Sequence, residues 1–388
     1  MIDRAVYIHW PFCESKCPYC DFNSHVRDGV DHGRWREALC REIRWWGGRA
    51  ARGDVSSVFF GGGTPSLMEP ETVEAVLQTI DDNFGLGADC EITLEANPSS
   101  VEADRFLAFR TAGINRLSLG VQSFEDETLR FLGRAHDAGQ ARSAIETARR
   151  TFDRFSFDLI YALPDQAEAV WRETLSRAID LSDGHLSLYQ LTIEPNTGFA
   201  GAVRRGAWAP MDDDGAADFY DITQQVCEDA GLPAYETSNH AAPGQESRHN
   251  LTYWRYGSWI GVGPGAHGRP LQKDGGRRAT SNWKKPERWL ESVEQADCGL
   301  EEFRALDKPE QAEEAFLMGL RLSEGISADA FAVATGVNIE QIVDSTALAH
   351  LQETGLVSVS GGGIRVEPSG RLLLNSITRD LLLEDDRV

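Results

Sequence analysis

Residues 9–24 read HWPFCESKCPYCDFNS, and this stretch places Cys13, Cys17 and Cys20 on one short loop with the spacing C-x3-C-x2-C. Thiolates bind zinc or iron–sulfur clusters. Crowded cysteines in a reducing compartment indicate metal binding or catalysis rather than a disulfide framework. The loop therefore predicts a metal centre.

Two kinds of centre fit three cysteines. Structural zinc takes four protein ligands, so a Cys3His site completed by His9 or His25 is one alternative. An iron–sulfur cluster on three protein thiolates is the other, and it leaves one iron open to an outside ligand. The four remaining cysteines are scattered singly and are predicted to be small buried residues: Cys40, Cys90, Cys227 and Cys298.

Composition limits the function classes. The 388 residues are 41% hydrophobic and 26% charged, which suits a globular chain with one barrel-sized domain and a smaller one. The net charge of −23 disfavours nucleic acid, because phosphate binding requires a basic surface. No apolar run is long enough to span a bilayer, so no transmembrane segment is expected. The first residues, MIDRAVYIHW, lack the features of a signal peptide, so we expect a cytoplasmic protein.

The first half of the chain alternates strands with helices. Stretches of helical periodicity, such as 70–84, 101–113 and 138–152, separate β-rich apolar runs. This order predicts βαβ units and a parallel sheet with functional residues on the loops after the strands. Six strands are too few for a closed barrel, so we predict an α/β fold with a partial (β/α)6 barrel. The predicted strands cover residues 5–10, 55–60, 90–96, 115–121, 154–160 and 185–193.

The second half is organised differently. The predicted barrel core covers residues 1–240, a less regular connecting segment covers 241–307, and a C-terminal domain covers 308–388. In the last domain, short helices precede GLVSVSGGGIRVEPSG (355–370), a predicted β-hairpin, which gives an α+β, winged-helix-like pattern. Residues 308–388 hold 13 Asp and Glu against 6 Lys and Arg, so this domain is expected to cover the barrel or dock a protein rather than bind DNA.

Polar residues follow several predicted strands. The second strand ends in FFGGGTPS (59–66), and glycines there let a backbone approach a ligand closely and expose its N–H groups. A Gly-rich turn alone is weak evidence, but further polar residues follow later strands. Together they predict a ligand with several polar groups at the barrel mouth. These residues are Glu95, Asn97, Gln122, Arg134 and Asp158.

The motifs YIHWPF-Cys13-x3-Cys17-x2-Cys20, GGGTPS, LEANP, RLSLGVQSF and DLIYALPDQ resemble the radical S-adenosylmethionine (SAM) family. The resemblance covers nearly the whole chain. It is closest to the branch of the oxygen-independent coproporphyrinogen III dehydrogenases and the HemW-type heme chaperones. It implies a [4Fe–4S] cluster on the three cysteines, with SAM on the fourth iron.

The same resemblance implies which residues line the SAM site. Backbone groups of Gly62, Gly63 and Thr64 would meet the methionine end, Arg134 its carboxylate and Glu95 the ribose hydroxyls. The full implied set is Tyr7, Tyr19, Gly62, Gly63, Thr64, Glu95, Gln122, Arg134, Asp158 and Ile160.

Two features separate the branches. The dehydrogenases carry a fourth cysteine in the pattern C-x3-C-x2-C-x-C, and this chain has Phe22 there. Residues 249–254 read HNLTYW and resemble the HNxxYW motif of the heme chaperones, which implies that His249 binds heme. A histidine beside an asparagine is otherwise most often a structural hydrogen-bonding residue.

From Phe22 and the HNLTYW motif together, we expect a heme chaperone that transfers heme to recipient proteins. A porphyrinogen dehydrogenase is the alternative, and a zinc protein without catalytic activity is a third hypothesis.

Overall fold

The computed structural model describes residues 3–27 and 29–383. Its main sheet has eight strands in the order β10-β1-β4-β5-β6-β7-β8-β9, and neighbouring strands are parallel except β8 with β9. The edge strands β10 and β9 are not paired with each other, so the barrel is open. The strands are β1 (Arg4–Trp10), β4 (Val55–Gly62), β5 (Leu86–Ala96), β6 (Arg116–Gln122), β7 (Arg154–Tyr161), β8 (His185–Gln190), β9 (Asn239–Ala241) and β10 (Ser258–Val262).

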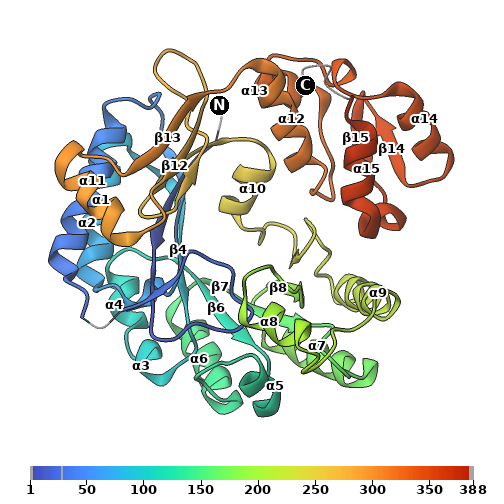
Figure 1. The fold of residues 1–388 in the computed structure, drawn as a ribbon, viewed down its shortest axis with the longest axis horizontal. Coiled ribbons are helices and arrows are strands. Elements are labelled where there is room, and N and C mark those ends of the chain that lie inside the picture. The colour runs from blue at the N-terminus through green and yellow to red at the C-terminus, as the bar shows by residue number, and fades with distance from the viewer. Residues whose placement is uncertain (1–2, 28, 384–388) are drawn as a thin grey trace.

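Helices cover the outer face of this curved sheet (Figure 1). Helix α6 illustrates why they form: Asp137 and Gln140 make a capping box, and Ile145 lies on a buried stripe of apolar residues at helical spacing. The helices of the barrel region are α1 (His32–Gly47), α2 (Pro70–Phe84), α3 (Ser100–Ala103), α4 (Phe106–Thr111), α5 (Asp126–Phe131), α6 (Ala138–Thr151), α7 (Glu168–Leu181), α8 (Gly198–Arg204) and α9 (Asp213–Asp229).

The connecting region contributes helices, a strand of the main sheet and a small second sheet. Helix α10 (Arg248–Trp254) carries the HNLTYW motif and lies between the barrel and the C-terminal part of the chain (Figure 1). A small antiparallel sheet of β11, β12 and β13 follows α10 in the chain. Separately, β2 and β3 form a parallel pair in the cysteine loop. These elements are β2 (Phe12–Cys13), β3 (His25–Val26), β11 (His267–Gly268), β12 (Arg278–Asn282), α11 (Pro286–Ala296) and β13 (Leu300–Ala305).

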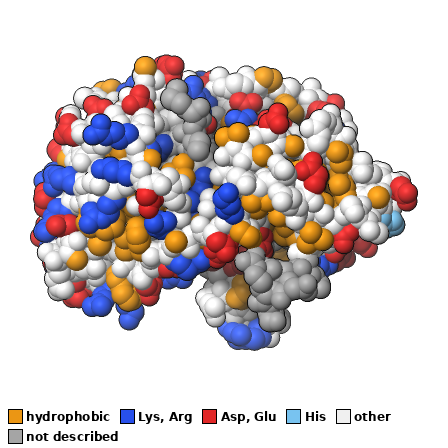
Figure 2. Space-filling view, turned by 90° about the horizontal axis from the view of Figure 1, so that it is seen from above, with side chains coloured by type: hydrophobic (Ala, Val, Ile, Leu, Met, Phe, Trp, Pro, Cys, Tyr) orange, Lys and Arg blue, Asp and Glu red, His pale blue; other side chains and the backbone are white. Residues whose placement is uncertain are grey.

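The C-terminal part has its own hydrophobic core, which also includes Tyr256 and Trp259 from the connecting region. The face of the molecule in Figure 2 carries both acidic and basic side chains, with hydrophobic ones between them. None of the helices among the described residues is long and apolar enough to cross a membrane. The elements are α12 (Lys308–Gly319), α13 (Ala328–Thr335), α14 (Ser345–Glu353), β14 (Val357–Ser360), β15 (Gly363–Val366) and α15 (Leu374–Leu381), with short 3-10 turns at Pro65–Leu67, Ile339–Gln341 and Pro368–Leu373.

The predicted partial barrel is confirmed: all six expected strands are present in one parallel sheet. Two further strands, β9 and β10, extend it at the edges; β9 crosses the predicted end of the barrel core at residue 240, and β10 lies in the predicted connecting segment. They have three and five residues, too short for a clear periodicity. The predicted helix over 101–113 is divided into α3 and α4. The domain boundaries remain predictions, and β10 of the expected connecting segment belongs to the main sheet.

One buried carboxylate joins α1 to the connecting region. Glu42 is fully buried and accepts hydrogen bonds from the backbone N–H groups of Gly263 (2.9 Å) and Gly299 (2.7 Å). Its Oε2 also accepts from Asn282 Nδ2 and Trp289 Nε1, each at 3.1 Å. All four partners donate, so the site requires a side chain with two acceptor oxygens.

We predict that Glu42→Gln lowers the free energy of unfolding by about 1–3 kcal/mol, because the amide NH2 replaces one acceptor and faces a donor. Urea unfolding measures the change. Glu37→Gln, on the exposed side of the same helix, is the control and should change stability by less than about 0.5 kcal/mol. Equal effects of the two substitutions would contradict this role of Glu42.

Candidate functional site

The cysteine loop is attached to the carboxyl end of β4 by backbone hydrogen bonds. Gly63 N donates to Trp10 O at 2.7 Å, and Thr64 N donates to Phe12 O at 2.8 Å. These bonds place Cys13, which follows Phe12, directly over the end of β4. The loop is thereby held at the edge of the sheet where parallel strands place functional side chains.

Glycine is required at the point of contact. Gly62 has φ of +118°, and a Cβ atom there would lie 2.7 Å from His9 and 2.8 Å from Trp10 O. At Gly63, a Cβ would lie 2.7 Å from Phe12 O and 2.9 Å from Cys13 Sγ. Both contacts are shorter than side chains tolerate, so the GGG motif permits the close approach of the two segments.

The N–H groups at this contact bond to other parts of the protein, whereas the sequence predicts that backbone groups here meet a ligand. Gly62 N donates to Glu95 Oε2 at 3.1 Å, and the N–H groups of Gly63 and Thr64 hold the cysteine loop. The role of Gly62, Gly63 and Thr64 in binding a ligand remains a prediction. The partners of these N–H groups could not be predicted from the motif, because they come from other segments of the chain.

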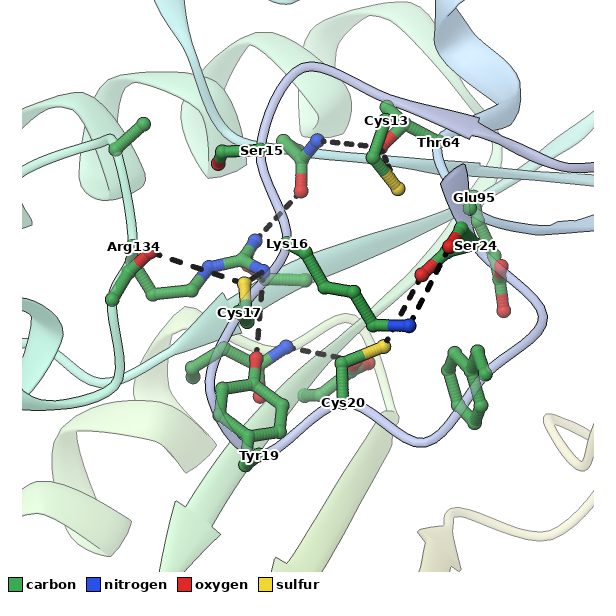
Figure 3. Close-up of a pocket in the computed structure, with 18 of the residues that line it drawn as sticks. Cys13, Ser15, Lys16, Cys17, Tyr19, Cys20, Ser24, Thr64, Glu95 and Arg134 are labelled. Atoms are coloured by element: carbon green, nitrogen blue, oxygen red, sulfur yellow. Dashed lines mark hydrogen bonds between the residues drawn. The ribbon is translucent and has the colours of Figure 1, made fainter. Parts of the chain in front are cut away.

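The three sulfur atoms border the same cavity, as Figure 3 shows. Thr64 Oγ1 donates to Cys13 Sγ at 3.5 Å, and Arg134 Nη1 donates to Cys17 Sγ at 3.5 Å. Cys20 Sγ lies 3.8 Å from Ser24 Oγ. Each cysteine therefore has a polar neighbour that can stabilise a thiolate.

The cavity has a volume of about 400 Å³, within the range of small-molecule sites. It brings together most of the residues expected to hold the metal and the organic cofactor. Those that line it are Cys13, Cys17, Tyr19, Cys20, Gly62, Gly63, Thr64, Glu95, Gln122, Arg134, Asp158 and Ile160. Lys16, Glu102 and Gln190 also line it, and no spacing in the sequence distinguished them.

The residues fit a cluster better than a single zinc ion. Both ring nitrogens of His9 have partners: Nδ1 lies 3.0 Å from Tyr7 OH and Nε2 lies 2.9 Å from Asn23 O. His25 Nε2 pairs with Asn23 Oδ1 at 3.1 Å. Within residues 3–27 and 29–383, no three His, Cys, Asp or Glu side chains converge closely enough to hold one ion. Three thiols around one space suit a larger, multi-iron group.

Arg134 joins the cysteine loop to the ends of two strands. Its Nη1 contacts Cys17 Sγ and also donates to Tyr19 OH at 3.4 Å. Its Nη2 donates to Asn97 Oδ1 at 2.7 Å and to Gly120 O at 2.8 Å. The guanidinium is therefore fixed in position, with its charge beside the sulfur atoms.

Two partly buried carboxyl groups, Glu95 and Asp158, line the cavity. Burial and the nearby charge of Asp158 raise the pKa of Glu95 to about 8, although the Gly62 N–H opposes this shift. Burial also raises the pKa of Asp158 to about 7, opposed by Arg134 and Gln122. Gln122 Nε2 donates to Asp158 Oδ2 at 3.4 Å. Two partly buried carboxyls of this kind are arranged to favour a ligand with positive charge or hydroxyl donors.

Tyr7 and His249 do not line the cavity, unlike the other residues expected to bind cofactors. Their rings and that of Phe59 form one cluster: Phe59 stacks on His249 with centroids 5.0 Å apart, and Tyr7 lies 6.3 Å from each of the other two. His249 is 2% exposed, with Nδ1 3.1 Å from Ser57 Oγ and Nε2 2.7 Å from Tyr253 OH. Burial lowers the pKa of His249 to about 3, so its imidazole is neutral.

We predict that Glu95→Gln changes the pH dependence of stability. A carboxyl with a raised pKa in the folded state stabilises the fold below its unfolded pKa of about 4.5, and this contribution is lost as pH rises through about 8. Between pH 4.5 and pH 8 the wild type should therefore lose about 4 kcal/mol more of its unfolding free energy than the variant does. Denaturation at both pH values measures this, with the exposed Glu127→Gln as control. A pH-independent difference would contradict the raised pKa.

Comparison with known proteins agrees with the geometry. Residues 7–178 match the family described as Radical SAM superfamily, and residues 306–373 match the HemN C-terminal domain. Among solved structures, coproporphyrinogen III oxidase (HemN) from Escherichia coli, reported as a radical SAM enzyme, has a TM-score of 0.81 and 25% sequence identity. The match covers 98% of this chain and 90% of that one.

Curated relatives extend over most of the chain. Heme chaperone HemW from Escherichia coli (strain K12) is 39% identical over 98% of both chains. The mitochondrial radical S-adenosyl methionine domain-containing protein 1 from Mus musculus is 43% identical over 83% of this chain and 74% of its own. Heme chaperone HemW from Bacillus subtilis (strain 168) is 32% identical over 96% of this chain and 98% of its own. The three cysteines at the cavity, the open parallel barrel and these matches show that this chain belongs to the radical SAM superfamily, in the family of the HemW proteins.

Proposed function

We propose that this protein binds heme and transfers it to recipient proteins, and that it holds a [4Fe–4S] cluster and SAM in the barrel cavity. The observation that carries the proposal is the near full-length similarity to proteins named heme chaperone HemW. The cavity geometry supports the cofactor part, because three cysteine sulfurs border a space that also contains polar groups suited to an amino acid and a nucleoside.

Cys13, Cys17 and Cys20 would hold the cluster, and a bound cluster would supply reducing electrons for chemistry at SAM. The side chains of the cavity would bind SAM and orient it. Arg134 presents a fixed cationic group to a carboxylate, and Glu95 presents an acceptor to hydroxyl groups. Glu95 and Asp158 would also attract a positively charged ligand.

The fold likeness to the oxidase HemN supports porphyrinogen dehydrogenation as the second candidate. Phe22 weighs against it. Its side chain is 61% exposed at the cavity, at the position where the dehydrogenase pattern has a fourth cysteine. Incubation with coproporphyrinogen III, SAM and reductant separates the two candidates: decarboxylated product would establish the second, and its absence with retained heme transfer would support the first.

His249 is proposed to contribute to heme binding. Its hydrogen bonds in this structure determine what must change before its ring can bind iron. Neutral imidazole is the form that ligates heme iron. In this structure both ring nitrogens are hydrogen-bonded, so binding through Nε2 requires release of the bond to Tyr253 OH. Helix α10 would have to shift or reorient for heme to reach the ring.

We predict that replacing Cys13, Cys17 and Cys20 together by Ala removes essentially all iron and sulfide, because no other cysteine among the described residues lines the cavity. Analysis of anaerobically purified protein measures this. Two controls should keep the full content: Phe22→Ala, which removes no ligand, and Cys40→Ala with Cys298→Ala, which removes distant thiols. Iron and sulfide retained in the triple variant would place the cluster elsewhere.

We predict that His249→Ala weakens heme binding about tenfold or more and changes the heme absorption spectrum, whereas Tyr253→Phe strengthens it. Tyr253→Phe removes the hydroxyl that competes with iron for Nε2. Heme titrations followed by absorbance measure both effects, with thermal melts alongside. Unchanged affinity and spectrum in His249→Ala, with lowered stability, would make His249 a structural residue only.

A further inference from the structure

Asn97 lies directly after β5 and contacts Arg134 and Thr64, two residues that donate hydrogen bonds to cysteine sulfurs. Its Oδ1 accepts from Arg134 Nη2 at 2.7 Å, and Arg134 Nη1 donates to Cys17 Sγ. Its Nδ2 donates to Thr64 Oγ1 at 3.3 Å, and Thr64 Oγ1 donates to Cys13 Sγ. One amide therefore lies between the two donors to the thiols.

The orientation of this amide is determined by its partners. Arginine only donates, so it must face the amide oxygen. On the other side, Glu102 Oε1 lies 3.2 Å from Asn97 Nδ2, and Glu102 Oε2 accepts from Asn97 N at 2.8 Å. The carboxyl is itself buried and hydrogen-bonded by Ser66 Oγ. A flipped amide would place its oxygen against this carboxyl and its NH2 against Arg134.

This orientation decides where the Thr64 hydroxyl hydrogen points. A hydroxyl has one hydrogen to donate, and its oxygen here already accepts from Asn97 Nδ2. The hydrogen is therefore directed away from Asn97, toward Cys13 Sγ at 3.5 Å. The bond from Arg134 Nη2 to Asn97 Oδ1 in turn holds the guanidinium so that Nη1 reaches Cys17.

We propose that Asn97 is a positioning residue that sets the hydrogen bonds to Cys13 and Cys17, and through them the reduction potential of the cluster. The inference rests on the proposed function, which places a cluster on these cysteines. Hydrogen bonds to cluster sulfurs stabilise the more negative, reduced state and raise the potential. The side chain of Asn97 acts on the sulfurs indirectly, so its effect passes through Thr64 and Arg134.

The isosteric variant Asn97→Asp separates the two arms. Its carboxylate still accepts from Arg134, so the bond to Cys17 is kept. The new oxygen also replaces the NH2 group that faces Glu102 Oε1, so a protonated Glu102 must donate to it. The Asp side chain then has no hydrogen to donate to Thr64 and accepts the hydroxyl hydrogen instead, so the bond to Cys13 is lost. Thr64→Val removes the same bond directly. We expect each variant to shift the reduction equilibrium about tenfold toward the oxidised cluster, which is about 59 mV more negative for a one-electron couple.

The negative charge that Asn97→Asp adds would also lower the potential, so the test is a double-mutant cycle. If the shift passes through Thr64, Asn97→Asp should have a clearly smaller effect in the Thr64→Val background. If the shift comes from charge alone, it should be the same in both backgrounds. Redox titrations followed by electron paramagnetic resonance measure the potentials, with iron and sulfide content and thermal melts on every variant.

Asn115→Asp is the matched control. Asn115 also bonds through both ends of its amide, to Ile92 N and Cys90 O, and it lies outside the cavity that the loop cysteines border. Its variant should leave the potential unchanged.

An unchanged potential in Thr64→Val, or equal effects of Asn97→Asp in both backgrounds, would overturn the inference while leaving the proposed function intact. Even if Asn97→Asp fails to fold, Thr64→Val alone tests whether the hydrogen bond to Cys13 affects the reduction potential. A wild-type protein that binds no cluster under reconstitution would overturn the proposed function and this inference with it.

Discussion

The contact between the cysteine loop and the end of β4 is the constraint on which the site depends. Two backbone hydrogen bonds, from Gly63 and Thr64, fix the loop, and the space for them exists only because residues 62 and 63 lack a Cβ atom. Once the loop is fixed, the three sulfurs border the cavity. Thr64, which supplies one of these backbone bonds, also supplies the hydroxyl that reaches Cys13. A residue that holds the loop in place therefore also contacts a cysteine sulfur.

The second constraint is electrostatic. The cavity contains the cation of Arg134 next to the thiols and two partly buried carboxyls, Glu95 and Asp158, with raised pKa values. Burying these carboxyls lowers the stability of the fold near neutral pH, where they would otherwise ionise. Such a cost is typical of functional sites, where groups are arranged for a ligand rather than for the empty protein. A ligand with a carboxylate, a positive charge and hydroxyl groups would provide partners for Arg134, Glu95 and Asp158.

Much of this could be predicted from the sequence because the information is local. The cysteine spacing, the glycines after β4 and the polar residues at strand ends are continuous motifs, and parallel strands place their ends together. Features that depend on distant segments could not be predicted. The partners of the Gly62 and Gly63 N–H groups and the burial of His249 against Ser57 and Tyr253 join segments that no spacing relates. Strands β9 and β10 were missed because short strands carry little periodicity.

The central claim is that three thiolates hold a cluster whose remaining iron is open to the cavity. Mössbauer spectroscopy of protein reconstituted with ⁵⁷Fe, recorded before and after addition of SAM, tests it most directly. The account predicts a [4Fe–4S] cluster in which one iron of the four changes its spectrum when SAM is added. Four irons that are unaffected by SAM, or a protein that takes up zinc at the three cysteines and forms no cluster, would contradict it.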